Sequence, residues 1–431
     1  MSTTTTAEPS ESTAQQESSW ALTLAYFGLI LFTVGYYNRP EDYLGGRYLP
    51  FALIGGVLAI GGYLVHLASG GHIARPRETI ILLLLFCWIL LSIVFANWVT
   101  GSFQAFQDKV AKVLLLTIVL ANAITSVSRF RKLLFIQVIS VAVMGWMAQY
   151  ALDITGRVSG NSQAFGNAND LAVLLCVNFP LLFYLLIEAK GYFRKATYAI
   201  VMGLVLYIIA LTYSRTGVLA LIVAIGALMW HFGIKTGRHA SVIAVGILLV
   251  VVFVAFAPSG YGKLMASIFS KEVDVSETMR SDAAESGKAR QGLLIRAIEV
   301  TLEHPIFGVG LDGFGELSGR WQVQHSTYLQ YSSEAGIPAL VLFLLLIRCT
   351  FVNLRGAERL SRKGSEVWRL AGALRASVWA FLVGALFTNF GYEFFGFFIF
   401  GFAAAIHQIA VDHPSAAEAD LDSSVLSETT D

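Results

Sequence analysis

The chain has 431 residues, of which 56% are hydrophobic and only 14% are charged, and its mean hydropathy is +0.65. A soluble protein of this length carries about a quarter charged residues, so the composition excludes an ordinary soluble domain. The formal net charge of +1 gives no overall field of the kind that attracts nucleic acid.

Apolar runs recur along the chain, and many have the length of about 18 residues that a helix needs to cross the hydrocarbon layer. They lack the short alternating pattern of a transmembrane β-barrel. We therefore predict an all-α polytopic membrane protein with about twelve transmembrane helices and one large loop. The spans are expected at 21–37, 48–68, 79–97, 110–127, 133–150, 169–188, 196–213, 216–232, 240–257, 327–347, 371–389 and 391–410.

Both ends of the chain are polar. Residues 1–20 have no basic segment before an apolar one, so they are predicted to be a disordered tail and not a signal peptide. Residues 411–431 are interpreted in the same way. The three cysteines lie in or beside apolar runs and are interpreted as small core residues, because they form neither a disulfide framework nor a metal set. They are Cys87, Cys176 and Cys349.

The distribution of basic residues predicts the orientation. If the N-terminus is cytoplasmic, the short loops on that side hold 16 Lys and Arg, and those on the other side hold 5. The positive-inside rule then places both termini in the cytoplasm and, in a bacterium, the large loop on the periplasmic face. The expected organisation is spans one to nine over 21–257, the periplasmic loop over 258–326, and spans ten to twelve over 327–410.

The large loop contains one helical pattern. A stretch rich in serine and acidic residues, 270–288, precedes the segment 289–305, whose apolar residues recur at helical spacing. This segment is predicted to be an amphipathic helix at the membrane surface, ended by Pro305. A glycine-rich turn, 308–315, follows it.

Arginines at the outer face are candidates for binding an anion. Arg215, in 212-TYSRTG-217, lies at the outer junction of the seventh and eighth spans. Its planar, permanently charged guanidinium suits a phosphate group, although an arginine at a helix end can also simply snorkel to water. Arg290 begins the loop helix, and Arg296 either faces the same anion or lies on a solvated face of that helix.

His325 lies where the large loop enters the tenth span. Histidine changes charge near neutral pH and can take a proton from an attacking hydroxyl as a general base. A single histidine is more often structural, but this one shares the polar outer face with Arg215 and Arg290. We therefore predict that His325 is catalytic.

Two further polar groups are expected near this face. Asn167, Asn169 and Asp170 precede the sixth span and suit a helix cap, and they are also candidates for lining a polar pocket. Asn389 and Glu393 fall at the outer junction of the last two spans and could reach the same pocket.

Several motifs are missing from the sequence. It has no HExxH, no phosphate-binding GxxxxGK[ST], no CxxC, and no acidic pair of the metal-binding kind beside the other polar residues. This favours a site without metal or cofactor, built on arginine and histidine.

Four segments resemble a known family. They are 166-GNANDLA-172, 212-TYSRTGVLAL-221, 290-RQGLLIRAIEVTLEHPIFGVGLDGFG-315 and 325-HSTYLQYSSEAGIPALVLFLLL-346. Their order and spacing over residues 160–350 are similar to those of the O-antigen ligase and polymerase superfamily of bacterial envelopes. The first five spans match that family only in hydropathy.

The resemblance implies an integral-membrane glycosyltransferase of the GT-C kind. Such proteins take a glycan from undecaprenyl diphosphate at the periplasmic face of the inner membrane and transfer it to an acceptor hydroxyl, with inversion and without a metal. Arg215, Arg290 and His325 match the family's two arginines and its histidine, and Tyr328 falls in the H-x-x-Y-L-Q motif. Two positions depart from the pattern, with Ser326 in place of the usual Asn and Leu294 in place of a frequent Trp.

The acceptor stays open at this point. A lipid A core sugar would make the protein an O-antigen ligase, which we favour slightly; a second lipid-linked repeat would make it a polymerase, and a protein hydroxyl an O-oligosaccharyltransferase. A polytopic transporter or lipid flippase is the alternative of another class. It is disfavoured, because no internal repeat is visible and the noted polar residues lie at the outer interface.

Overall fold

The computed structural model describes most of the chain. The described residues are 11–39, 50–150, 157–160, 166–237, 240, 244, 246, 277–319 and 322–412, with only the backbone described for 11–19, 76 and 277–289. The ninth predicted span, 240–257, and the segment 258–276 lie almost wholly outside this part of the chain. The same is true of the first ten residues and of 413–431.

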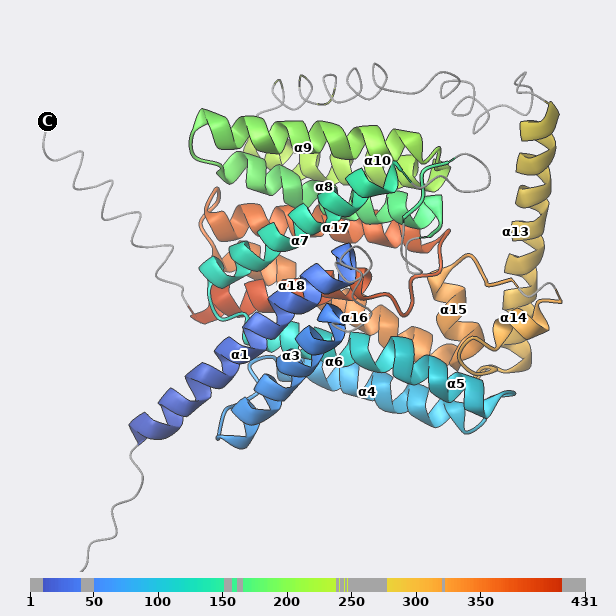
Figure 1. Cartoon of the computed structure of the whole chain (residues 1–431), viewed down its shortest axis with the longest axis horizontal. Helices are drawn as coiled ribbons and strands as arrows, with labels where there is room; N and C mark the ends of the chain where they lie inside the picture. The colour runs from blue at the N-terminus through green and yellow to red at the C-terminus, as the bar shows by residue number, and fades with distance from the viewer. Residues whose placement is uncertain are drawn as a thin grey trace, which may run out of the picture.

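The protein is a bundle of long helices (Figure 1). Within the described residues, nine helices are long and apolar enough to cross a membrane, which confirms the predicted all-α polytopic fold. The elements are α1 (Glu11–Asn38), α3 (Phe51–Ala68), α4 (Pro76–Ile93), α5 (Val99–Ala105), the π-helix η1 (Phe106–Val110), α6 (Ala111–Ala123), α7 (Val127–Ala148), α8 (Ala168–Glu188), α9 (Tyr192–Leu211), α10 (Arg215–Phe232), the short η2 (Ile234–Thr236), α13 (Glu277–Glu303), α14 (Phe314–Leu317), α15 (Thr327–Glu334), α16 (Gly336–Leu360), α17 (Glu366–Ala385) and α18 (Phe394–Asp412).

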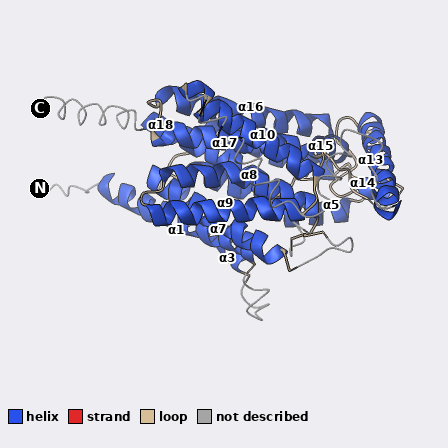
Figure 2. Cartoon of the chain, turned by 90° about the horizontal axis from the view of Figure 1, so that it is seen from above, coloured by secondary structure: helices blue, strands red, loops and turns tan. Residues whose placement is uncertain are grey.

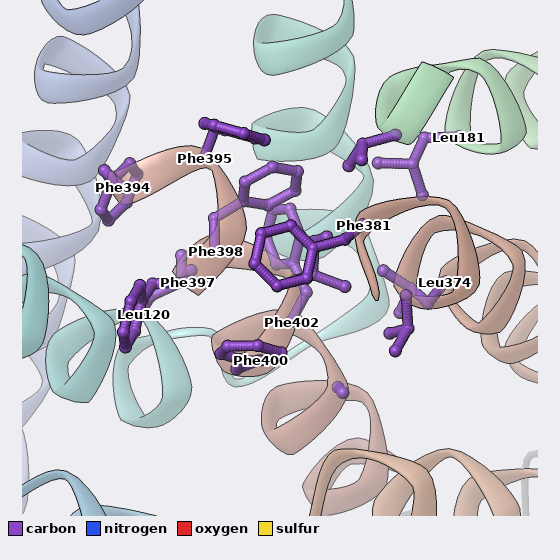
Figure 3. Close-up of a cluster of buried hydrophobic side chains, with 14 of the residues drawn as sticks. Leu120, Leu181, Leu374, Phe381, Phe394, Phe395, Phe397, Phe398, Phe400 and Phe402 are labelled. Carbon is purple, nitrogen blue, oxygen red and sulfur yellow. The ribbon is translucent and has the colours of Figure 1, made fainter. Parts of the chain in front are cut away.

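The core lies where α6, α8, α17 and α18 meet, and Figure 3 shows its phenylalanines packed side by side. The run 394-FFGFFIFGF-402 is buried along its whole length. Phe381 of α17 makes an edge contact with Phe400 of α18 at 5.7 Å between ring centroids. Because α18 is apolar on all sides, it can occupy the centre of the bundle, with the other helices packed around it.

Helix α13 lies across one end of the bundle, which we call the α13 end (Figures 1 and 2). The sequence pattern predicted a surface helix over 289–305, and α13 extends further towards its N-terminus, to Glu277. Both α1 and α18 have their terminal ends at the opposite, remote end of the bundle (Figure 2). The chain therefore enters and leaves the bundle at the end away from α13.

The predicted span 327–347 is corrected, because the structure divides it into α15 and α16. The break falls at Gly336, which has φ +84°, and a Cβ there would lie 1.9 Å from the carbonyl oxygen of Ile306. Only glycine tolerates this backbone and this close approach. The helix that crosses the bundle is thus α16, and α15 is a separate short helix at the α13 end.

Two other predicted boundaries are corrected. Helix α1 begins at Glu11, inside the tail predicted as disordered, because the good helix formers Glu, Ala and Gln of 11–17 extend the apolar helix that follows. Helix α16 continues to Leu360, so Arg348 and Arg355 lie on a helix and not in a loop.

Candidate functional site

Helices α8 and α10 begin side by side at the α13 end. Asn167 is the N-cap of α8, and its side chain accepts a hydrogen bond from the backbone N–H of Asn169 at 2.9 Å. Ser214 caps α10 by accepting from the N–H of Gly217 at 3.1 Å, and its hydroxyl donates to Asn169 Oδ1 at 2.7 Å. The two helix N-termini, both favourable to negative charge, are therefore joined by one buried hydrogen bond.

Arg215 is the first residue of α10 and is exposed to solvent. The turn before it is tight, since Tyr213 has φ +47° and Thr212 is buried. A Cβ on Gly217 would lie 2.5 Å from the Cβ of Ala172, so the two helices approach each other closely. This packing fixes Arg215 beside the N-terminus of α8.

Arg157 is a neighbour that the sequence did not single out. Its Nη2 donates to Asn169 Oδ1 at 3.2 Å and its Nε donates to the carbonyl of Thr212 at 2.8 Å. The sequence did offer a signal for Arg157, because it is another arginine in a short outer loop, ten residues before Asn167. Arg157 holds the starts of α8 and α10 together and adds positive charge next to Arg215.

Helix α15 presents His325 at the same end of the bundle. His325 is half-buried and immediately precedes Ser326, the N-cap of α15. The next residue, Thr327, is buried and binds the turn between α17 and α18: its hydroxyl donates to the carbonyl of Thr388 at 2.9 Å and accepts from the N–H of Phe390 at 2.9 Å. His325 is thus fixed against the turn that carries Asn389 and Glu393.

The residue before His325 belongs to a buried pair. Gln324 Nε2 donates to Glu334 Oε1 at 3.0 Å, and the exposed fractions of the two residues are 0% and 1%. Burial and the neighbouring charge of Asp312 raise the pKa of Glu334 to about 7. The carbonyl of Glu334 also accepts from the N–H of Gly310 at 2.9 Å, which ties the glycine-rich turn to α15.

Sequence reasoning missed this pair, although Glu334 falls inside the segment 325–346 that resembles the family. An acidic residue directly before an apolar run was the available signal. Because Gln324 is the residue next to His325, the pair fixes the backbone that carries the imidazole.

Helix α13 brings Arg290 to the site and carries Arg296 away from it. The inner face of α13 is buried through Leu293, Ala297 and Val300, and the hydroxyls of Thr301 and Ser332 hydrogen-bond at 2.9 Å. Arg290 is exposed to solvent, and it is close enough to Arg215 and Asp170 to interact with both electrostatically.

Of the two placements expected for Arg296, the structure has the one on the charged face of α13. Its guanidinium pairs with Glu299 at 3.1 Å and with Glu303 at 3.0 Å on the charged face of α13. Positions 290 and 296 are six residues apart, so they point to different sides of one helix.

The electrostatic neighbours of Arg290 connect the predicted residues. Partial desolvation lowers the pKa of Arg290, the positive charge of Arg215 lowers it further, and the carboxylate of Asp170 raises it. Burial lowers the pKa of His325, and the charge of Arg290 lowers it further. Arg290 therefore lies within electrostatic reach of Arg215, Asp170 and His325, and the imidazole is held in its neutral form near neutral pH.

The remaining candidates have different surroundings. The Tyr328 hydroxyl donates to the carbonyl of Leu382 at 3.2 Å, so it has a structural partner in α17. Glu393 accepts from the Tyr36 hydroxyl at 3.0 Å, and burial raises its pKa. Asn389 Oδ1 is buried and has no hydrogen-bond partner among the described residues. One hydrogen-bond acceptor is therefore unused in the turn that Thr327 of α15 binds.

The arrangement suits the binding of a polyanion next to a base. Two arginines that lack a carboxylate within salt-bridge distance among the described residues, Arg215 and Arg290, lie with the N-termini of α8 and α10 and a neutral imidazole. Within the described residues, no three His, Cys, Asp or Glu side chains gather in a set that could hold a metal ion.

The comparisons with known proteins agree with the sequence reasoning. Residues 200–344 match the family model described as O-antigen ligase. The matched stretch runs from α9 into α16 and includes Arg215, Arg290 and His325. The resemblance to the O-antigen ligase superfamily is thereby confirmed over this stretch. No curated protein matches the chain.

Proposed function

We propose that this multi-pass membrane protein is a glycosyltransferase with a lipid-diphosphate donor, and the match of residues 200–344 to the family model described as O-antigen ligase supports this. The donor is a glycan on undecaprenyl diphosphate, and the acceptor is a hydroxyl of a lipid A core sugar. The observation that carries the proposal is the meeting of Arg215, Arg290 and a neutral His325 at one end of the bundle.

The arginines are assigned to the leaving group. As the anomeric C–O bond breaks, its electron pair moves to the diphosphate, whose negative charge grows. Arg215 and Arg290 are already fixed at the α13 end, so they stabilise this charge more in the transition state than in the ground state. The N-termini of α8 and α10 add partial positive charge on the same side.

His325 is assigned to the acceptor. Its neutral imidazole takes the proton of the attacking hydroxyl while the acceptor oxygen forms the new glycosidic bond on the opposite face of the sugar. The glycan is transferred with inversion, and the lipid diphosphate leaves. A site at the bundle end lets the polyprenyl chain stay in the bilayer while the sugars stay in water, which accounts for a histidine where the loop meets α15.

The proposal is tested with purified protein and a synthetic undecaprenyl-diphosphate oligosaccharide. Lipid A core, a second lipid-linked repeat and a serine-containing peptide are offered in separate reactions, and glycosylated product is followed by mass spectrometry. We expect product with lipid A core. Product only with the second repeat or the peptide would assign the protein to the polymerase or protein-glycosylating branch instead. No donor consumption by folded protein would favour a transporter.

The pH profile gives a separate test of the base. Transfer is expected to fall as the pH drops through the pKa of His325, because a protonated imidazole cannot accept the hydroxyl proton. That pKa lies below the ordinary value of 6.5, and Arg290 is one of the two causes. In Arg290→Gln one cause is removed, so the acid limb of kcat/KM should move to higher pH.

The matched control for this profile is Arg215→Gln, since Arg215 is not among the causes of the His325 shift. It should lower the rate and leave the acid limb where it is in the wild type. An acid limb at the same pH in all three proteins would contradict the assignment of that limb to His325.

A further inference from the structure

One face of α16 changes character along its length. Near the α13 end the exposed residues are Ile337, Val341 and Leu344, as expected of a surface against lipid. Further along, the same face carries exposed arginines, with the exposed Val352 between the first two. They are Arg348, Arg355, Arg359 and Arg362, which we call the arginine stripe. Spacings of seven and four residues place Arg348, Arg355 and Arg359 on one side of α16, and Arg362 lies just after the end of this helix.

The carboxylates at the remote end are already paired with other cations. Glu358, which faces the bundle from α16, binds Lys235 at 3.0 Å and Arg375 at 2.6 Å. Glu78 binds Arg75 and Arg77, and Glu366 binds Arg131. Within the described part of the chain, no carboxylate lies within salt-bridge distance of the arginine stripe.

Helix α4 shows where this stripe sits relative to the bilayer. Its Trp88 Nε1 donates to the carbonyl of Ala335, next to the start of α16. At its other end, Arg75 Nη2 donates to Asn353 Oδ1 at 2.8 Å. The apolar stretch of α4 therefore ends at the level of Asn353.

Counted from Asn353, Arg348 thus lies about one and a half turns towards the bilayer interior. Arg359 lies beyond the boundary, a rise of about 16 Å from Arg348 along α16, and Arg362 follows the end of the helix. An exposed arginine at the depth of Arg348 is costly unless an anion meets it or its side chain reaches the headgroups.

We propose that the arginine stripe binds the phosphate groups of anionic phospholipids in the leaflet at the remote end. The face is continuous with the apolar surface of α16, so an occupant there has acyl chains beside Val341 and Leu344 and its headgroup beside the arginines. A guanidinium binds phosphate oxygens through two parallel hydrogen bonds. Clusters of basic residues at the end of a span are the usual binding surface for such lipids.

The test compares two variants with the same loss of charge. Arg355→Gln, Arg359→Gln and Arg362→Gln are combined to remove the stripe outside the bilayer. The control combines Lys190→Gln, Arg194→Gln and Lys195→Gln, which are exposed at the start of α9. Delipidated full-length protein is titrated with phosphatidylglycerol in mixed micelles, and bound lipid is counted by native mass spectrometry.

We expect the stripe variant to bind phosphatidylglycerol at least about tenfold more weakly than the wild type, and the control to keep most of the binding. Phosphatidylcholine and inorganic phosphate should bind weakly to all three proteins. Equal phosphatidylglycerol binding by the stripe variant and the wild type would overturn the proposal. Inorganic phosphate that displaces the lipid at equal concentration would do so too, since it would indicate a site for free anions.

Discussion

Replacement of His325 by alanine is expected to abolish glycan transfer, with kcat/KM reduced by at least about 10²-fold, because general base catalysis contributes roughly 10²–10⁴-fold. The imidazole is half-buried and kept neutral by burial and by Arg290. The backbone around it is held by Thr327 and Gln324, not by the imidazole. The variant should therefore insert and fold normally, and transfer is measured with the lipid-linked donor and the preferred acceptor.

His304→Ala is the matched control, since His304 is exposed just after α13. It should keep wild-type transfer. Donor binding, measured as a shift in Tm on addition of the lipid-linked glycan, should survive in His325→Ala, because the diphosphate is assigned to the arginines. Near-normal transfer by a folded His325→Ala variant would remove the base from the mechanism. Loss of donor binding in that variant would move His325 into the donor site.

Replacement of either Arg215 or Arg290 by alanine should lower kcat/KM by about 10²–10³-fold, as removal of a fixed charge-stabilising donor does in other enzymes. Both side chains are exposed at the α13 end, and neither has a described carboxylate within salt-bridge distance, although Arg290→Ala also removes the cation that acts on Asp170. Lysine at either position should recover only part of the loss, because it keeps the charge but not the planar fork. The assay is initial-rate transfer over a range of donor concentrations.

Arg296→Ala separates this role from the general effect of removing an arginine from α13. Its partners are Glu299 and Glu303, so transfer should change by no more than a few-fold.

The double variant Arg215→Ala/Arg290→Ala should lose less than the product of the two single losses, since both residues act on one diphosphate. Losses that multiply independently, or an equal loss in Arg296→Ala, would contradict the shared site.

Most of the spans were predictable because each is a local property of the chain. A run of apolar residues long enough for the hydrocarbon layer becomes a helix wherever it stands, since its backbone groups must be paired within it. Caps are equally local: Asn167 and the residues after it were predicted as the cap of α8, and Asn167 is that cap. The division into α15 and α16 was missed because Ala335 and Gly336 interrupt no apolar pattern. Only the approach of Ile306 shows why the chain must turn there.

The candidate site was predictable from the sequence only in part. Arg215, Arg290 and His325 were predicted from residue chemistry and family resemblance, and the electrostatic coupling places them in one neighbourhood. The helical period alone could have separated Arg296 from Arg290, because a six-residue spacing turns a side chain to another side of the helix. In the prediction, both placements of Arg296 were left open.

By itself, then, the sequence determined the class of protein, the approximate spans and the residues with suitable chemistry, because these depend on composition and on periods of a few residues. The tertiary structure decided which polar groups support those residues. Arg157 reaches Asn169 across a loop, and Gln324 reaches Glu334 from the far end of α15. The arginine stripe also became visible only once α16 was seen to continue to Leu360. Such pairings depend on how helices pack against one another, and no local pattern in the chain encodes that packing.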